Sequence, residues 1–336
     1  MSEPNLTEPN PPDTGPVTGP IADLSYRTYD GPLSPPRARW WAIARAASRQ
    51  TFAKRGFWIL TVLGAWYYLV MIVIVFFVEQ VLSASPQPTN RAMDFFTRIV
   101  WKDQFLHGLS FAQLIFMIVT LMAGAGAIAN DNRANALLVY LSKPCTKGDY
   151  IIGKWIGVFM PVFVAMALPT FVFYLYGAMT FQSYGFLTAD PWMGPKLLAL
   201  LPLMAAFQTS LILGFSSCFN QGRLAGFAYA GLYMLTNLFT QLMVGVFMNY
   251  VSRDNTAIDQ VPATVKTFFY ASIDGLNIGL TKAILGTHGS PYFGIPSRIP
   301  SMRAPELLPV LALIIALSVG ATVLAWRRVR AVEVVG

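Results

Sequence analysis

Six hydrophobic runs, each free of Asp, Glu, Lys, Arg and His, alternate with polar segments along the chain. A helix needs about 20 apolar residues to cross a bilayer, and every run reaches that length. Only helices and closed barrels satisfy all backbone groups in lipid. The pattern therefore predicts an all-α polytopic membrane protein with six transmembrane helices. Their expected bounds are about 56–78, 110–129, 155–179, 197–219, 224–250 and 307–326.

An amphipathic segment, residues 37–55, precedes the first run. At about 100° per residue, its apolar positions gather on one side and two arginines lie opposite. This predicts a helix lying in the membrane interface, with tryptophans as anchors and arginines reaching lipid headgroups. The alternative is a plain basic flank to the first span. The apolar side holds Trp40, Ile43, Ala44, Ala47 and Thr51, and the expected anchors are Trp40, Trp41, Arg45 and Arg49.

Two other segments do not fit the pattern of spans. Residues 1–36 are rich in proline and cannot bury a core, so we expect a disordered cytoplasmic tail, with no signal-peptide pattern. Residues 251–305 form the longest loop. Their middle part has helical spacing that breaks near Asp274. We expect a pair of short helices there, re-entrant or on the outer surface, before the last span.

Composition and charge support a membrane protein. Hydrophobic residues make up 55% of the chain and charged residues only 12%. The net charge of +8 would suit nucleic acid, but the basic residues lie beside hydrophobic runs, so we expect lipid and no nucleic acid as a partner. Basic residues cluster before the first run and after the last one. The positive-inside rule then places both termini in the cytoplasm and the chain in the cell (inner) membrane.

No enzyme is predicted from the motifs. The segment from Gly148 to Lys154 matches the start of a phosphate-binding loop, but Trp155 stands where Ser or Thr should bind magnesium. The chain has no GxSxG or HExxH motif, and Cys145 and Cys218 lack metal-ligand spacing. We expect no catalytic residue, metal or cofactor on this chain. Because the six runs lack ionisable groups, energy for transport would come from elsewhere.

The polar residues inside the runs are amides and hydroxyls. Asn237 and Gln241 are spaced to share one helix face, and Gln208 lies in the neighbouring run. Our first interpretation is interhelical hydrogen bonding, which contributes roughly 1 kcal/mol per pair. The alternative is that these three side chains line a translocation path.

A basic interruption, residues 130–154, separates the second and third runs. A helix beginning near Arg133, after a polar capping segment, would end at Pro144 and Gly148. We therefore expect a short, basic, amphipathic helix on the cytoplasmic surface between two spans. Its apolar group is Leu137, Leu138, Tyr140 and Leu141.

Together these features resemble the ABC-2 type permeases, the transmembrane subunits of ATP-binding-cassette transporters. In that family the loop after the second span carries an acidic residue, a run ending in Leu-Leu-Ser-x-Pro, a basic position and Gly-Lys. This chain has Asp131, the run from Leu137 to Pro144, Lys147 and Gly153-Lys154. The likeness covers about residues 37–330. It departs from the family at Asp131, usually Glu, and at Asn135 and Ala136, where a small-Thr pair is common.

The resemblance implies the permease subunit of an exporter, paired with a second permease chain as a homodimer or heterodimer. ATP and magnesium would bind to a separate cytoplasmic ATPase. The loop helix would be a coupling helix seated on that ATPase. A membrane scaffold or binding subunit without transport is the competing interpretation. The implied docking residues are Asp131, Arg133, Leu137, Leu138, Tyr140, Leu141, Lys143 and Pro144.

Overall fold

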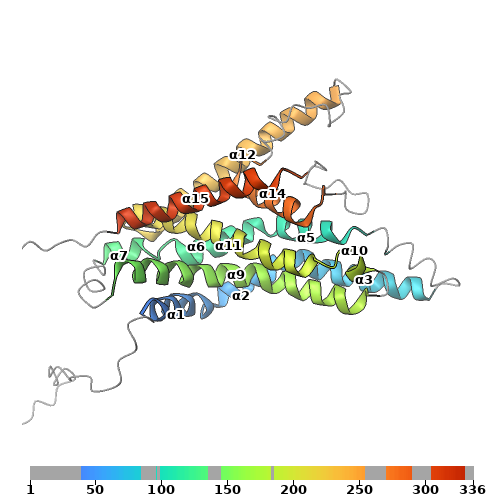
Figure 1. The fold of residues 1–336 in the computed structure, drawn as a ribbon, viewed down its shortest axis with the longest axis horizontal. Helices are drawn as coiled ribbons and strands as arrows, with labels where there is room; N and C mark the ends of the chain where they lie inside the picture. The colour runs from blue at the N-terminus through green and yellow to red at the C-terminus, as the bar shows by residue number, and fades with distance from the viewer. Residues whose placement is uncertain are drawn as a thin grey trace, which may run out of the picture. The chain divides into compact units, whose positions relative to one another are not determined.

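The structure is a computed structural model that describes residues 39–84, 96, 99–134, 145–182, 185–253, 270–289 and 304–329. Every element in these ranges is an α-helix, which confirms the all-α expectation (Figure 1). The predicted tail, the central part of the predicted loop helix (135–144) and much of residues 251–305 lie outside the described residues. The helices are α1 (Arg39–Phe52), α2 (Arg55–Gly64), α3 (Trp66–Ser83), α5 (Trp101–Phe111), α6 (Gln113–Gly124), α7 (Ala129–Arg133), α9 (Lys147–Thr180), α10 (Phe186–Ala189), α11 (Met193–Cys218), α12 (Gly222–Arg253), α14 (Ile273–Leu285) and α15 (Leu307–Arg328).

Four helical segments are long and apolar enough to cross a membrane. They are α6 with α7, α9, α11 and α15, and they correspond to the predicted second, third, fourth and sixth spans. The pair α2 and α3, bent by 48°, passes the same test as one unit and corresponds to the first span. Helix α12 covers the predicted fifth span with 32 residues but is not among these candidates, so its crossing stays a prediction.

Helix α11 lies at the centre of the bundle, where it packs against α6, α9, α12, α14 and α15. Of its most apolar stretch 72% is buried, compared with 11% for α15, which is therefore peripheral. A Cβ atom on Gly214 would lie 3.0 Å from the Cβ of Ala321 on α15. The two helices thus approach closely through small residues, as is common in membrane bundles.

The predicted amphipathic segment forms helix α1, and its apolar side packs on α9. Ala44 is buried, and a Cβ atom on Gly157 of α9 would lie 2.6 Å from the Cβ of Ala47. Protein therefore covers the side that the sequence suggested for lipid. Trp41 remains 48% exposed and so is free to contact an interface. The seating of α1 in lipid stays a prediction.

Helix α14 begins at the sequence break noted near Asp274. The hydroxyl of Ser272 accepts a hydrogen bond from the backbone N–H of Gly275 at 2.9 Å, which caps the first turn. The helix ends at Gly286, whose φ of 65° lies in the left-handed region that favours glycine. Because α14 packs against α5, α11, α12 and α15, it is built into the bundle.

Candidate functional site

An ion pair joins α7 and α9 at the base of the predicted coupling loop. The Nζ atom of Lys154 lies 2.8 Å from Oδ2 of Asp131, and the hydroxyl of Tyr150 donates to the same oxygen at 2.8 Å. Asp131 and Lys154 are only 18% and 13% exposed, so water screens the pair less than at a free surface. Thr146 and Asp149 form a capping box that starts α9. Both ends of the loop are therefore fixed to each other.

Helix α7 is also fixed to its neighbours α11 and α12. The buried hydroxyl of Ser216 on α11 accepts hydrogen bonds from the backbone N–H groups of Ile128 and Ala129, each at 3.0 Å. The side chain of Asn130 accepts from the backbone N–H of Gly222, at the start of α12, at 3.2 Å. A displacement of α7 would therefore reach three other helices.

The structure describes only two of the eight predicted docking residues. Asp131 lies inside α7 with its carboxylate paired to α9, and Arg133 ends α7 with an exposed side chain. Asp131 therefore holds the loop closed at its base. The other six predicted docking residues lie outside the described residues: Leu137, Leu138, Tyr140, Leu141, Lys143 and Pro144.

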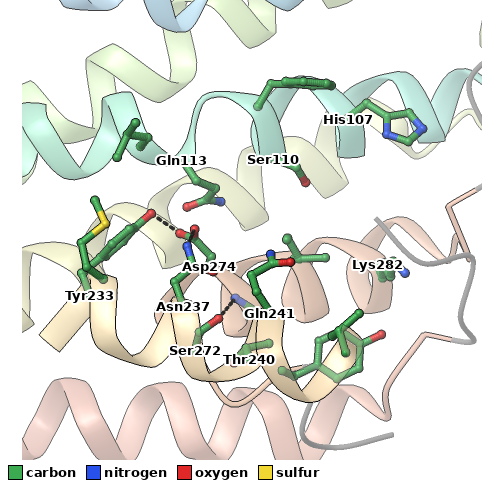
Figure 2. Close-up of a pocket in the computed structure, with 17 residues that line it drawn as sticks. His107, Ser110, Gln113, Tyr233, Asn237, Thr240, Gln241, Ser272, Asp274 and Lys282 are labelled. Carbon is green, nitrogen blue, oxygen red and sulfur yellow. Dashed lines mark hydrogen bonds between the residues drawn. The ribbon is translucent and has the colours of Figure 1, made fainter. Parts of the chain in front are cut away.

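A pocket of about 360 Å³ with both polar and apolar lining lies between α5, α6, α12 and α14 (Figure 2). This volume falls within the range of small-molecule sites. Ring carbons of Phe111, Tyr233 and Tyr270 supply apolar lining. The polar lining comes from all four helices and from the residue before α14: His107, Ser110, Gln113, Tyr233, Asn237, Thr240, Gln241, Ser272, Asp274 and Lys282.

The carboxylate of Asp274 is the centre of the hydrogen bonds in this pocket. The hydroxyl of Tyr233 donates to Oδ1, and Nδ2 of Asn237 donates to Oδ2 at 2.5 Å. Figure 2 shows Asp274 directed toward these two residues of α12. The amide predicted as interhelical hydrogen-bonding partner thus binds a carboxylate on α14 and also lines a cavity.

The three amides predicted for a translocation path do not gather in one place. Asn237 and Gln241 line the pocket, as their shared helix face suggested. Gln208 is fully buried in α11, where its Oε1 accepts from the hydroxyl of Thr120 on α6 at 2.9 Å. It is not one of the pocket residues, and its Nε2 has no hydrogen-bond partner among the described residues. Gln208 therefore acts as a link between α6 and α11.

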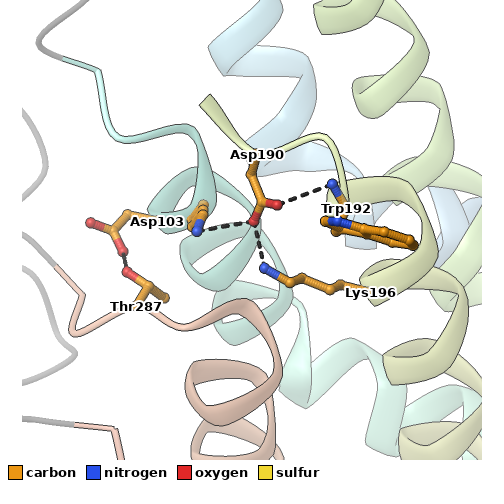
Figure 3. A network of polar contacts seen from close by, with 6 residues as sticks. Asp103, Asp190, Trp192, Lys196 and Thr287 are labelled. Atoms are coloured by element: carbon orange, nitrogen blue, oxygen red, sulfur yellow. Dashed lines mark hydrogen bonds and ion pairs between the residues drawn. The ribbon is translucent and has the colours of Figure 1, made fainter. Parts of the chain in front are cut away.

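A second polar network lies around Asp190, in the connection between α10 and α11 (Figure 3). Its Oδ2 atom lies 2.6 Å from Nζ of Lys196 and 2.9 Å from Nζ of Lys102. Burial alone would raise the pKa of Asp190, but hydrogen bonds and charge from the two lysines outweigh burial and hold this pKa below its ordinary value of 3.8. The network joins α5 to the start of α11.

Sequence reasoning missed the ionisable groups that α14 and α5 bring into the bundle. Lys282, His107 and Asp103 are 1%, 2% and 3% exposed, although none lies in a predicted span. Asp103 accepts a hydrogen bond from the hydroxyl of Thr287 just after α14 (Figure 3). One local signal was present: Ser272 is a residue type favoured as a helix N-cap, and it directly precedes the apolar periodic segment that forms α14.

Comparison with known protein families shows which family the chain belongs to. The model of a family described as ABC-2 family transporter protein matches residues 41–272. The match runs from α1 to the residue before α14, so it includes the base of the loop and the Asn237 side of the pocket. No curated protein matches the chain. Because the family model covers more than half of the sequence, the chain belongs to the ABC-2 family of transporter proteins.

Proposed function

We propose that this permease subunit of an ABC transporter works as an exporter and is driven by a separate cytoplasmic ATPase through loop 130–154. The ATPase would carry ATP and magnesium. Both chain termini would lie in the cytoplasm and the bundle in the cell (inner) membrane. The observation that supports the coupling role is the ion-paired base of the loop, formed by Asp131 and Lys154.

The geometry of this base suits the transmission of motion. Closure of an ATPase around ATP would displace the loop. Because Lys154 ties α9 to α7, the two helices would then move together. Helix α9 has 34 residues and is therefore about 50 Å long at 1.5 Å per residue. It acts in this proposal as a lever from the loop to the far side of the bundle.

A second permease chain and lipid complete the proposed assembly. Helix α12 has exposed apolar side chains such as Phe227, Leu235 and Leu238. An exposed apolar helix surface suits lipid or a second chain better than water. The second chain would be either an identical copy, giving a homodimer, or a different permease, giving a heterodimer.

The decisive experiment replaces two residues of the predicted loop helix. Leu138→Asp/Leu141→Asp should leave the helices inserted but release the ATPase. Truncating a hot-spot residue costs about 2 kcal/mol or more, which is about 30-fold in affinity per residue. Co-purification of the ATPase and size-exclusion profiles in detergent measure the two outcomes. The matched control is Leu138→Met/Leu141→Met, which keeps the apolar volume and should keep the partner.

A variant at the loop base separates docking from coupling. Lys154→Met removes the ion pair with Asp131 and leaves the predicted docking residues intact. The ATPase should still co-purify, while the dependence of its hydrolysis on the permease should weaken.

One outcome of the first experiment contradicts the coupling role. If Leu138→Asp/Leu141→Asp retains both the ATPase and coupled hydrolysis, the loop is not the coupling element, and the interpretation as a membrane scaffold is favoured.

A further inference from the structure

The carboxylate of Asp274 is partly buried beside a cavity, yet its hydrogen-bond partners are neutral. Tyr233 and Asn237 are its hydrogen-bond donors, and among the described residues it makes no ion pair. A carboxylate withdrawn from water is unfavourable unless a positive charge or a proton compensates it. Two donated hydrogen bonds leave further lone pairs of the carboxylate free to accept. Asp274 is therefore able to take a cationic partner from outside the chain.

The lysine of the same pocket does not fill this role. Lys282 lies eight residues after Asp274 on α14, which places the two Cα atoms about 12 Å apart along the helix axis. Burial lowers the pKa of Lys282 to about 8, and the negative charge of Asp103 on α5 partly offsets this effect. Figure 2 shows Lys282 at the right of the view, apart from Asp274, which lies near the centre beside Asn237. The carboxylate of Asp274 and the side chain of Lys282 thus occupy separate parts of the lining.

Two other features of the lining point to a ligand. Thr240 lines the pocket, and its hydroxyl oxygen is shielded from solvent and has no hydrogen-bond partner among the described residues. Aromatic rings of Phe111, Tyr233 and Tyr270 line the same cavity. Aromatic faces attract cations, most strongly where water is excluded. A carboxylate and aromatic rings around one cavity together match the needs of an organic ammonium group.

We propose that the pocket between α5, α6, α12 and α14 binds an organic ammonium ion, with Asp274 as its anionic partner. The aromatic lining would hold the apolar body of the ligand. This proposal rests on the proposed permease function and assigns the class of its substrate: small amines with an aromatic or aliphatic body that fits about 360 Å³.

Equilibrium dialysis against the full-length chain in lipid nanodiscs tests the proposal. Naphthylmethylamine is the probe, and naphthylmethanol is its neutral counterpart of nearly the same shape. Empty nanodiscs correct for partitioning of the probes into lipid. At neutral pH the amine carries a proton, so the two probes differ in charge and share their apolar body.

The expected result is an amine affinity at least tenfold above that of the alcohol. Asp274→Asn should abolish this preference and leave binding of the alcohol unchanged. Glu306→Gln is the matched control, since it removes one negative charge from an exposed residue that does not line the pocket, and it should bind both probes as the wild type does. Equal binding of the two probes by the wild type, or unchanged amine binding by Asp274→Asn, overturns the proposal.

A competition measurement on the wild type covers the case in which Asp274→Asn does not fold. A trimethylammonium derivative of the naphthylmethyl probe cannot lose its charge and should displace the amine. Failure to displace it overturns the proposal and indicates that Asp274 takes up only a proton. None of these measurements involves an ATPase. Loss of the proposed coupling would therefore leave amine binding intact, and absence of amine binding would leave co-purification with the ATPase intact.

Discussion

At the scale of single residues, Asp190 has the clearest energetic role. Its carboxylate forms ion pairs with Lys102 on α5 and Lys196 on α11. Its Oδ1 atom also accepts a hydrogen bond from the backbone N–H of Trp192 at 3.1 Å. Asp190 is buried, whereas Lys102 and Lys196 are 28% and 30% exposed. Partial exposure weakens each ion pair through solvent screening. The network is therefore a moderate structural link between α5 and α11, and it depends on the charge of one residue.

Asp190→Asn should lower the free energy of unfolding by about 1–3 kcal/mol, because two ammonium groups lose their anionic partner. The carboxylate has a lowered pKa in the folded state, so its contribution is present above its unfolded pKa and is lost as pH falls through the folded pKa. The stability difference between wild type and variant should thus be constant near neutral pH and shrink below about pH 4. Thermal unfolding in detergent across this range measures it.

A difference that persists undiminished well below pH 4 would contradict a charge-based role for Asp190. Glu306→Gln again serves as the control, because Glu306 is exposed and its side chain makes no cap hydrogen bond at α15. Its melting temperature should follow the wild type at every pH.

At the scale of elements, the contact between α1 and α9 depends on two glycines. Gly153 and Gly157 face α1, and a Cβ atom on Gly153 would lie 2.7 Å from the Cβ of Ile43 and from the backbone oxygen of Trp40. Distances below 3.0 Å leave no space for a side chain unless one helix shifts. Backbone atoms cannot give way as a flexible side chain can, so the helices fit only because these positions carry glycine.

Gly157→Ala should loosen α1 from α9, since overpacking a close contact costs typically about 1–3 kcal/mol. The basic residues Arg45 and Arg49 would then become better sites for trypsin, and limited proteolysis in lipid nanodiscs should cut faster there. Gly320→Ala on α15 is the control, because a Cβ atom added to Gly320 would meet nothing within 4 Å. That variant should be cut at the wild-type rate.

Equal proteolysis of the two alanine variants would mean that lipid, and not α9, holds α1 in place. That result would support the prediction from sequence that Trp40 and Trp41 anchor the helix at the membrane interface.

At the scale of the whole molecule, orientation in the membrane follows from the placement of basic residues and can be checked by labelling. Thr188 is exposed in α10, on the predicted outer side. The native Cys145 precedes α9 on the predicted cytoplasmic side. In intact cells an impermeant maleimide should label Thr188→Cys in a background of Cys145→Ser/Cys218→Ser.

The same reagent should reach Cys145 of a Cys218→Ser variant only after the cells are disrupted. Labelling of Cys145 in intact cells, with Thr188→Cys protected, would reverse the predicted orientation.

Much of the architecture was predictable because the bilayer imposes local rules. A span needs a long apolar run, and such a run is visible without knowledge of the fold. Helices α6, α9, α11 and α15 lie within or around the predicted runs for that reason. The loop pattern from Asp131 to Lys154, combined with the predicted topology, likewise indicated the family that the family model shows. Even the start of α14 has a local signal in the capping residue Ser272.

The pairing of side chains was decided by tertiary structure. Asp274 meets Tyr233 and Asn237 only because α14 packs against α12, and these residues are 41 and 37 positions apart in sequence. Helix packing likewise brings Asp131 to Lys154. It also places the apolar side of α1 against α9, where the sequence had suggested lipid. Hydropathy measures how favourable a lipid environment is for a side chain. It does not determine which neighbouring side chains that residue contacts in the folded protein. The sequence by itself therefore determined the four candidate spans and the family, whereas only packing decided the pocket and the partners of its carboxylate.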